Sequence, residues 1–420
     1  MSNVSSSNGL EKYPKLRFKG FSEPWSTIGF ETLFSYISNN TLSRAELNYE
    51  SGEYQNVHYG DVLIKYGPIL DADVEELPFI TDGKNTKFHN MLLQDGDVII
   101  ADTAEDEAVG KATEIINIGS RKVVSGLHTF ACRPLVNMTP TYLGFYINSE
   151  TFHKQLYSLM QGVKVLSISK SNIANTIIRY PCQAEQVKIC SLLNMIEARI
   201  AKQRHVIELL KKYKRGAIRS FLMPETCPIK NAVWNDATIG ELGTFIKGAP
   251  LSKADICNEG TPFILYGELY TTYGEVINYV VRRTQQSVDD SYLSRIGDVL
   301  IPTSGETPEE IATASCVMVS DVILAGDLNI FRTSKVDGRI MSYILNYIVN
   351  GNITRIAQGK SVVHIQASEI SKICISYPDE NTQKKMIGIF DRISTRIDSE
   401  EKTLLRMTDL KKSLLQRLFI

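Results

Sequence analysis

The amino-acid sequence predicts an α+β protein with two globular domains, each followed by a long helix, in which the two helices form an antiparallel coiled coil. Two observations support this fold class. A helical pattern of apolar residues occurs twice with the same spacing, and the remainder holds short runs rich in Val, Ile and Tyr, separated by Gly, Pro, Asn and Asp. The 420 residues are enough for two to three domains with cores of their own.

Both long helices are predicted from an apolar seam whose residues step by three and four positions. Polar residues interrupt the seam at the same two places, Gln203 and Lys214 in the first helix and Glu400 and Lys411 in the second. The seam residues are Ile189, Leu193, Ile196, Ile200, Ile207 and Leu210, and then Met386, Phe390, Ile393, Ile397, Leu404 and Met407. Each second-helix position is the first-helix position plus 197, and each helix of about 40 residues can reach roughly 60 Å.

The repeat continues upstream of the helices. Tyr180-Pro181 matches Tyr377-Pro378 at the same offset, and further upstream the offset drifts, as expected where surface loops gain and lose residues. The predicted segments are a first globular domain over 11–180, a first helix over 181–222, a second globular domain over 223–377 and a second helix over 378–420. The chain is therefore interpreted as an internal duplication with a pseudo-twofold axis.

Short apolar runs within the globular parts predict the strands, and longer ones predict helices. Strands are expected at 62–65, 97–101, 122–124, 263–266, 276–281 and 317–324, and helices at 142–160 and 341–350.

Connectivity predicts the direction of the helices. The first helix delivers the chain to the second domain, so the second helix must run back to bury its seam against the first. Equivalent antiparallel helices are related by an approximate twofold axis, which would put the two domains at opposite ends of the pair. The end of the chain at Ile420 should then lie near Pro14.

Positive charge is concentrated in the two predicted helices. Residues 183–222 hold nine basic and three acidic side chains, and residues 379–420 hold nine and seven, although the whole chain has a net charge of -1. Two similar heads on a basic spacer suit a long ligand with two sites at a set separation, and duplex DNA is such a ligand. The basic run Lys211, Lys212, Lys214, Arg215 and Arg219 also fits the bland interpretation of a helix end that favours cations.

Several motifs carry a resemblance to a known family. They are Pro14-x-Leu-Arg-Phe-x-Gly-Phe21 with Trp25, the helix entry Glu185-Gln186-x-Lys-Ile189, the Gly-Asp-Val strands, and the Leu-Lys-Lys and Phe-Leu helix ends. In these features the sequence resembles the specificity subunit of a type I restriction-modification enzyme, from about residue 11 to 420. The second helix entry departs from the pattern, with Asn381-Thr382-Gln383 in place of Glu-Gln.

This resemblance implies a non-catalytic subunit with two target-recognition domains, each reading one half of a split sequence in double-stranded DNA. It also implies that the helices set the unread gap and dock two modification (methyltransferase) subunits, and through them restriction and translocase subunits. S-adenosylmethionine, ATP and Mg²⁺ are then expected on those partners, with no cofactor or metal on this chain.

Candidate DNA-contacting residues were sought in polar turns, where Gln and Lys can address base edges and Gly allows close approach. The candidates are Gln161, Lys164, Gln358, Lys360 and Ser361 in two matching turns, with Arg121, Lys122, Arg282 and Arg283 as secondary candidates for phosphate contact. A turn that only reverses the chain is nearly as good an interpretation of the first five.

The sequence supports other functions less well. A coiled-coil scaffold that reads no DNA remains the alternative, and a metal-dependent nuclease built on Asp379, Glu400 and Glu401 is rejected because one helix would hold these carboxylates some 30 Å apart. The chain has no Pro-Pro dipeptide for an adenine methyltransferase loop and no phosphate-binding Gly-x4-Gly-Lys motif. The seven cysteines form no Cys-x-x-Cys motif, and the N-terminus is polar. These features predict a cytoplasmic protein that does not span a membrane.

Overall fold

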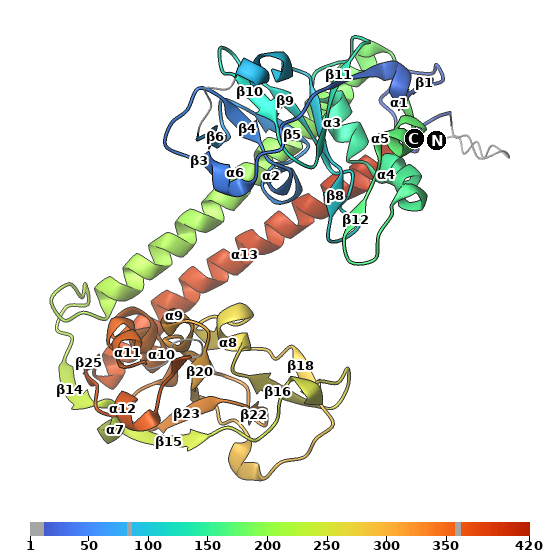
Figure 1. The fold of residues 1–420 in the computed structure, drawn as a ribbon. Helices are drawn as coiled ribbons and strands as arrows, with labels where there is room; N and C mark the ends of the chain where they lie inside the picture. Colours follow the sequence, from blue (N-terminus) through green and yellow to red (C-terminus); the bar gives the residue numbers. More distant parts are fainter. Residues whose placement is uncertain (1–11, 82–85, 358–362) are drawn as a thin grey trace. The chain divides into compact units, whose positions relative to one another are not determined.

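The computed structural model describes residues 12–81, 86–357 and 363–420. The chain divides into two units, Met1–Gln203 with Thr403–Ile420, and Arg204–Lys402. Two long helices, α6 (Gln183–Phe221) and α13 (Glu380–Leu418), each contribute one half to unit 1 and the other half to unit 2 (Figure 1). Within the described ranges, no helix is long and apolar enough to cross a membrane.

Unit 1 is built on a five-stranded sheet. In order across it lie β2 (Phe34–Ile37), β11 (Thr129–Pro134), β7 (Val98–Ala101), β9 (Ala112–Ile116) and β5 (Ile69–Asp71). All neighbours are antiparallel except β9 and β5, which are parallel. The remaining strands are β10 (Val123–Ser125), β4 (Gln55–Val57), β6 (Phe79–Ile80) and β3 (Leu47–Asn48) in a second sheet, and the pairs β1 (Ser26–Gly29) with β13 (Ile177–Tyr180) and β8 (Thr103–Ala104) with β12 (Leu166–Ser167).

Unit 2 repeats this topology. Its five-stranded sheet has the order β15 (Gly243–Lys247), β23 (Leu328–Thr333), β19 (Val299–Pro302), β21 (Ser315–Val317) and β17 (Val276–Ile277). Again only the last pair is parallel. The remaining strands are β18 (Arg282–Thr284), β16 (Thr261–Leu265) and β22 (Ile323–Ala325) in a second sheet, and the pairs β14 (Trp234–Thr238) with β25 (Cys374–Pro378) and β20 (Ser304–Gly305) with β24 (Val363–His364). The predicted duplication therefore extends to strand order and sense in the five-stranded sheets, while the second sheet has four strands in unit 1 and three in unit 2.

Short helices connect these strands. In unit 1 they are α1 (Phe30–Leu33), α2 (Tyr59–Ile64), α3 (Tyr142–Ile147), α4 (Glu150–Leu156) and α5 (Lys170–Ala174), with 3-10 turns at Arg44–Glu46, Thr86–Met91 and Tyr157–Leu159. In unit 2 they are α7 (Ile239–Leu242), α8 (Glu268–Thr271), α9 (Pro308–Ile311), α10 (Gly338–Tyr347), α11 (Asn350–Ile356) and α12 (Ala367–Ile370), with 3-10 turns at Lys253–Asp255 and Asp290–Tyr292.

The core of unit 1 is closed by both long helices. Leu193 of α6 and Leu418 of α13 are buried in one apolar cluster, and the Phe419 ring packs edge-on against Trp25 and Tyr146. The Leu16 N–H donates to the Arg417 carbonyl at 2.8 Å, so the end of the chain does lie beside the segment that follows Pro14. Further along α6, Glu197 forms an ion pair with Lys411. A later residue of α6 therefore contacts an earlier residue of α13, which means that the two helix segments are antiparallel.

Unit 2 has the equivalent arrangement. The Phe221 ring of α6 packs edge-on against Phe390 of α13, with centroids 5.7 Å apart, and Phe390 in turn contacts Tyr343 of α10. Earlier in α6, Lys211 pairs with Glu401 at 2.6 Å. The helix segments are therefore antiparallel in this unit too, and the predicted α+β fold class is confirmed.

A glutamine fixes the start of each long helix. The Gln186 side chain accepts from the Thr139 N–H at 2.9 Å and donates to the Pro181 carbonyl at 3.0 Å. Gln383 does the same with the Asp337 N–H and the Pro378 carbonyl, both at 2.8 Å. Each side chain satisfies a backbone carbonyl just before the long helix and a backbone N–H of the loop before α3 or α10, which explains why the second helix entry keeps its glutamine.

The glutamate beside it has a role in unit 1 alone. Glu185 is fully buried and accepts two hydrogen bonds, at 2.9 and 2.8 Å, from the guanidinium of Arg17. At the equivalent place in unit 2, Thr382 donates to Asp379 instead. The departure of the second entry from the family pattern is therefore matched by the absence of an arginine eight residues before Trp234, where Thr226 stands.

Four predicted elements differ from the structure, and one of them is the strand expected at 276–281, of which only Val276–Ile277 forms β17. The strand expected at 62–65 is part of α2, because Val62 and Tyr66 share a buried face while Ile64 is 89% exposed. The helix expected at 142–160 is interrupted after α3, where Ser149 caps α4. The strand expected at 317–324 is two strands, β21 and β22, separated by a bend at Asp321 with φ +61°.

Replacing Arg17 tests the buried ion pair. Arg17→Met leaves the Glu185 carboxylate buried without its partner, and we expect a loss of about 3–5 kcal/mol in the free energy of unfolding of unit 1. Arg17→Met combined with Glu185→Leu should recover much of that loss, because no charge is then stranded. Urea unfolding followed by circular dichroism measures both, with Lys15→Met, an exposed neighbour, as the control. A double variant as unstable as the single one would contradict this explanation.

Candidate functional site

The predicted seam residues lie on the inner faces of α6 and α13. Ile189, Leu193, Ile200 and Ile207 are buried, and Ile196 and Leu210 are half-buried. In α13, Met386, Phe390 and Ile397 are buried, and Ile393, Leu404 and Met407 are half-buried. The side chains most exposed to solvent lie between these positions.

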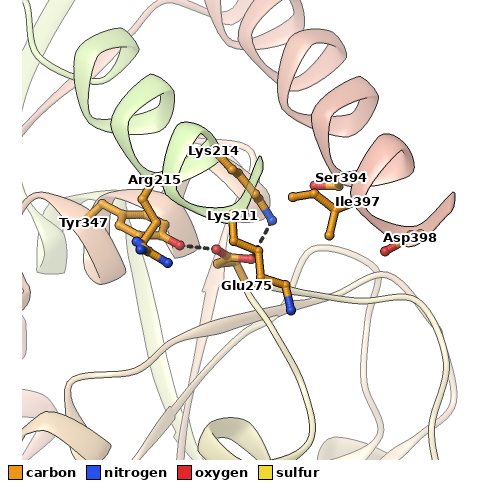
Figure 2. Close-up of a pocket in the computed structure, with 8 residues that line it drawn as sticks. All are labelled: Lys211, Lys214, Arg215, Glu275, Tyr347, Ser394, Ile397 and Asp398. Carbon is orange, nitrogen blue, oxygen red and sulfur yellow. Dashed lines mark hydrogen bonds and ion pairs between the residues drawn. The ribbon is translucent and has the colours of Figure 1, made fainter. Parts of the chain in front are cut away.

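The seam lysine of α6 joins this helix to the second domain. The Lys214 ammonium lies 2.9 Å from Oε2 of Glu275, the residue that precedes β17. The Tyr347 hydroxyl of α10 donates to the other carboxylate oxygen (Figure 2). Burial by itself raises the pKa of the Glu275 carboxyl, but Lys214 and the Tyr347 hydroxyl outweigh it and hold that pKa below its ordinary value of 4.5.

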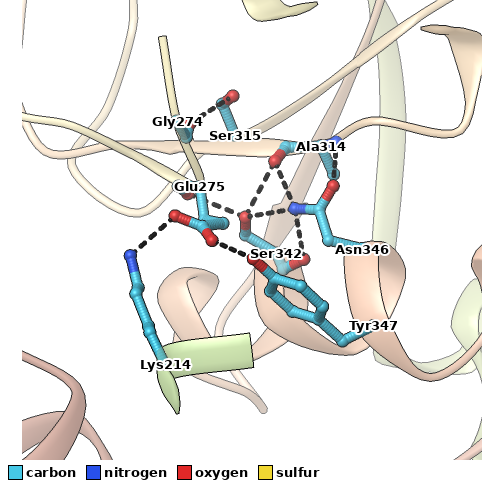
Figure 3. A network of polar contacts seen from close by, with 8 residues as sticks. All are labelled: Lys214, Gly274, Glu275, Ala314, Ser315, Ser342, Asn346 and Tyr347. Atoms are coloured by element: carbon cyan, nitrogen blue, oxygen red, sulfur yellow. Dashed lines mark hydrogen bonds and ion pairs between the residues drawn. The ribbon is translucent and has the colours of Figure 1, made fainter. Parts of the chain in front are cut away.

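The Lys214 contact belongs to a larger polar network in unit 2. The Ser342 hydroxyl donates to the backbone carbonyl of Glu275 at 2.7 Å, and the Asn346 amide donates to the Ala314 carbonyl at 2.7 Å (Figure 3). In unit 1, the Asn148 amide donates to the Ala112 carbonyl at the same distance. The asparagine is thus part of the repeated frame.

A cavity of about 210 Å³ lies beside the Lys214 ion pair. Its lining includes Lys211, Arg215, Ile397 and Asp398, and Figure 2 shows side chains of both charges around it. Lys211 is already paired with Glu401. Two residues of the basic run, Lys211 and Lys214, thus hold α6 against its neighbours by ion pairs, while Lys212 and Arg219 are exposed.

The secondary candidates for phosphate contact lie at the domain surfaces in local contacts. In unit 1, Arg121 pairs with Asp73 at 2.9 Å and Lys122 with Glu53 at 2.6 Å. In unit 2, Arg282 pairs with Glu268 at 2.7 Å, and Arg283 donates to the Gly260 carbonyl at 2.8 Å.

The turn that holds Gln161 and Lys164 is closed by two backbone hydrogen bonds between Gln161 and Ser167, at 2.9 and 2.8 Å. Both candidate side chains are exposed, and Val163 at the tip is 98% exposed. The matching candidates of the second domain, Gln358, Lys360 and Ser361, lie outside the described residues.

The carboxylates of the two Gly-Asp-Val motifs, Asp97 and Asp298, have structural contacts. Asp97 is buried and accepts from Arg133 at 2.7 Å and from the Gln94 N–H at 2.7 Å. In unit 2, Asp298 accepts from Arg332 and from the Arg295 N–H in the same way. Each pair ties the turn before a central strand to the neighbouring strand.

The carboxylates of the rejected nuclease are far apart. Asp379 precedes α13, whereas Glu401 lies more than five turns along the same helix, where it pairs with Lys211. In the part of the chain that the structure describes, no group of three or more His, Cys, Asp or Glu residues could hold a metal ion.

One polar cluster in unit 1 was not predicted from the sequence. The His128 Nδ1 lies 3.3 Å from Oδ1 of Asp102, and its ring packs edge-on against Tyr59, with centroids 5.3 Å apart. These residues lie far apart in the chain: Tyr59 begins α2, Asp102 lies between β7 and β8, and His128 directly precedes β11. Only the pairing of β7 with β11 brings them together.

The Lys214 ion pair predicts an acid-dependent stability. Because folding lowers the pKa of Glu275, the pair stabilises unit 2 above about pH 4.5, and its contribution is lost as the pH falls through the lowered value. Lys214→Met should reduce the free energy of unfolding at pH 7 by about 1–3 kcal/mol. The difference from the unsubstituted chain should shrink on going from pH 6 to pH 3.5 in urea unfolding. Lys212→Met is the control, and a difference independent of pH would contradict the ion-pair explanation.

The second half of the chain matches a known family. Residues 231–407 match the model of the type I restriction modification DNA specificity domain. One relative is a protein of Methanocaldococcus jannaschii that is provisionally named type I restriction enzyme MjaX specificity subunit. It is 22% identical to this chain over 427 residues, and the alignment covers 97% of this chain and 96% of the relative.

Two solved structures share the fold of the chain. The S subunit of a type I restriction-modification system from M. genitalium is 14% identical, with a TM-score of 0.54 over 97% of this chain and 99% of its own. A chain from a study of complex assembly and conformational transition of the type I R-M system is 15% identical, with a TM-score of 0.54 over 94% and 97%. The resemblance predicted from the sequence is confirmed: residues 231–407 match the model of the type I specificity domain, and the chain is similar in fold to the S subunit of a type I restriction-modification system.

Proposed function

We propose that this chain is the DNA-recognition subunit of a type I restriction-modification enzyme, in which each globular domain reads one half of a bipartite target. The five-stranded sheets of the two domains have the same strand order and sense, but the domains differ in sequence. Two similar domains with different surfaces suit a DNA target that consists of two different half-sequences, or words. The helix pair then sets the length of the unread gap.

The observation that supports this proposal most directly is the way each unit is closed. Each domain packs against one end of α6 and the opposite end of α13. Each helix therefore has one end in each unit, which is what a helical spacer between two reading surfaces requires. A scaffold protein could use the same helices, but it would have no need of two diverged copies of one domain.

The chain itself is proposed to be non-catalytic. Two modification subunits would dock on the helices and carry S-adenosylmethionine, and restriction and translocase subunits would carry ATP and Mg²⁺. Because the proposed ligand is cellular DNA, we place the complex in the cytoplasm.

Exchanging one domain tests the modular reading. When residues 22–165 are replaced by the equivalent segment of another specificity protein, only one half of the methylated motif should change. The measurement is the methylated motif in cells that express this chain with its modification subunit. The matched exchange of residues 231–362 should change only the other half. A change in both halves, an unsplit motif, or assembly without sequence-specific DNA binding would contradict the proposal, and the last would favour the scaffold.

Lengthening the helices tests the spacer. One heptad inserted at mid-length in both α6 and α13 keeps the seam in register and adds roughly 10 Å. The gap between the two words should widen by about three base pairs, with both words unchanged. The same insertion in α6 alone is the control, because it breaks the pairing with α13. Changed words with the original gap would count against a helical spacer.

A further inference from the structure

The two domains share a backbone junction at which three loops meet. In domain 1, the Asp102 N–H donates to the His128 carbonyl at 3.1 Å, and the Asp102 carbonyl accepts from the Ile168 N–H at 2.9 Å. In domain 2, the Thr303 N–H donates to the Asp327 carbonyl at 2.8 Å, and the Thr303 carbonyl accepts from the Ile365 N–H at 3.0 Å. The junction therefore has the same hydrogen bonds in both copies.

The strands around the junction confirm that these positions are equivalent. Asp102 follows β7 and precedes β8, and Thr303 follows β19 and precedes β20. His128 directly precedes β11, and Asp327 directly precedes β23. In each domain the junction lies where the two central strands of the main sheet end.

The side chains on this shared frame differ in chemistry. Where domain 1 has the carboxylate of Asp102, domain 2 has the hydroxyl of Thr303. Where domain 1 has the imidazole of His128, domain 2 has the carboxylate of Asp327. His128 is 47% exposed and Asp327 is exposed. The Asp327 Oδ2 accepts from the Ser304 hydroxyl at 2.8 Å, which orients the carboxylate.

The backbone of His128 has an unfavourable conformation. Its φ is +54°, in the left-handed region that a residue with a side chain seldom adopts. In the matching turn of domain 2, the left-handed residue is Gly326, with φ +77°, one position earlier. A strained histidine at the surface, oriented by Asp102 and Tyr59, indicates selection for its side chain rather than for the turn.

Cations lie next to the junction in domain 1. Strand β12 pairs with β8 immediately after Asp102, and the turn that carries the exposed Lys164 leads into β12. The Lys170 ammonium lies over the ring of Phe130, two residues after His128, at 5.8 Å. Hydrogen-bonding side chains flanked by lysines fit a duplex, because the lysines can contact phosphates while the polar side chains reach base edges.

We propose that these junctions contact the bases, with Asp102 and His128 reading for domain 1 and Thr303 and Asp327 for domain 2. This inference rests on the proposed function and deepens it. A shared backbone frame lets both domains dock on DNA in the same way, and the exchanged side chains let them read different words. The Asp327 carboxylate can only accept, so it selects a base with an exposed amino group in the major groove, such as cytosine.

Two substitutions test the assignment in the assembled modification complex. Asp327→Asn adds a donor and should reduce discrimination at one position of the domain 2 word by roughly 10-fold, with the domain 1 word unchanged. His128→Asn, which tolerates a left-handed φ, should change one position of the domain 1 word alone. The controls are Asp321→Asn, another exposed aspartate beside a serine hydroxyl, and His89→Asn, an exposed histidine elsewhere in domain 1.

The readout is the motif methylated in cells, together with the motif that the purified complex enriches from a random DNA duplex library. The library keeps the test informative if a variant methylates poorly. An altered position in only the expected word supports the inference, and enrichment of the original motif by both variants overturns it. If the domain exchange changes a word but these variants do not, this inference fails while the proposed function stands.

Discussion

The apolar seam between α6 and α13 is the constraint on which the rest of the structure depends. Neither core is complete without it, since Leu193 and Leu418 share one cluster and Phe221 and Phe390 pack together in another. Each domain is therefore closed by a helix segment from the other half of the chain. Burial of this seam couples the folding of the two copies, because the hydrophobic contribution is lost if either helix is missing.

The two copies agree where the backbone needs a particular side chain. Gln186 and Gln383 satisfy the same two backbone groups, and Asp97 and Asp298 accept from the equivalent arginines. The Arg17–Glu185 contact exists in one copy only, and both partners are absent from the other. A buried carboxylate without its cation would be strongly destabilising.

Periodicity and repetition in the sequence predicted the long helices, their direction and the duplicated α+β domains. Short elements were less predictable, because a run such as 62–65 fits a strand as well as a turn of helix and only its buried partners decide. Of the candidate site, the polar turn at Gln161 is surface-exposed as expected. The junction of Asp102 with His128 was missed, because strand pairing alone brings these residues together.

Function in such a protein must come from what differs between the copies. The sheets, the helix entries and the Gly-Asp turns are needed for folding in both, so they cannot distinguish two words. The side chains at 102 and 128, and at 303 and 327, lie on a frame that is held by the same backbone hydrogen bonds whatever those side chains are. A position of this kind can change its hydrogen-bonding chemistry at little cost to the core. It is where a duplicated recognition domain is free to acquire a new specificity.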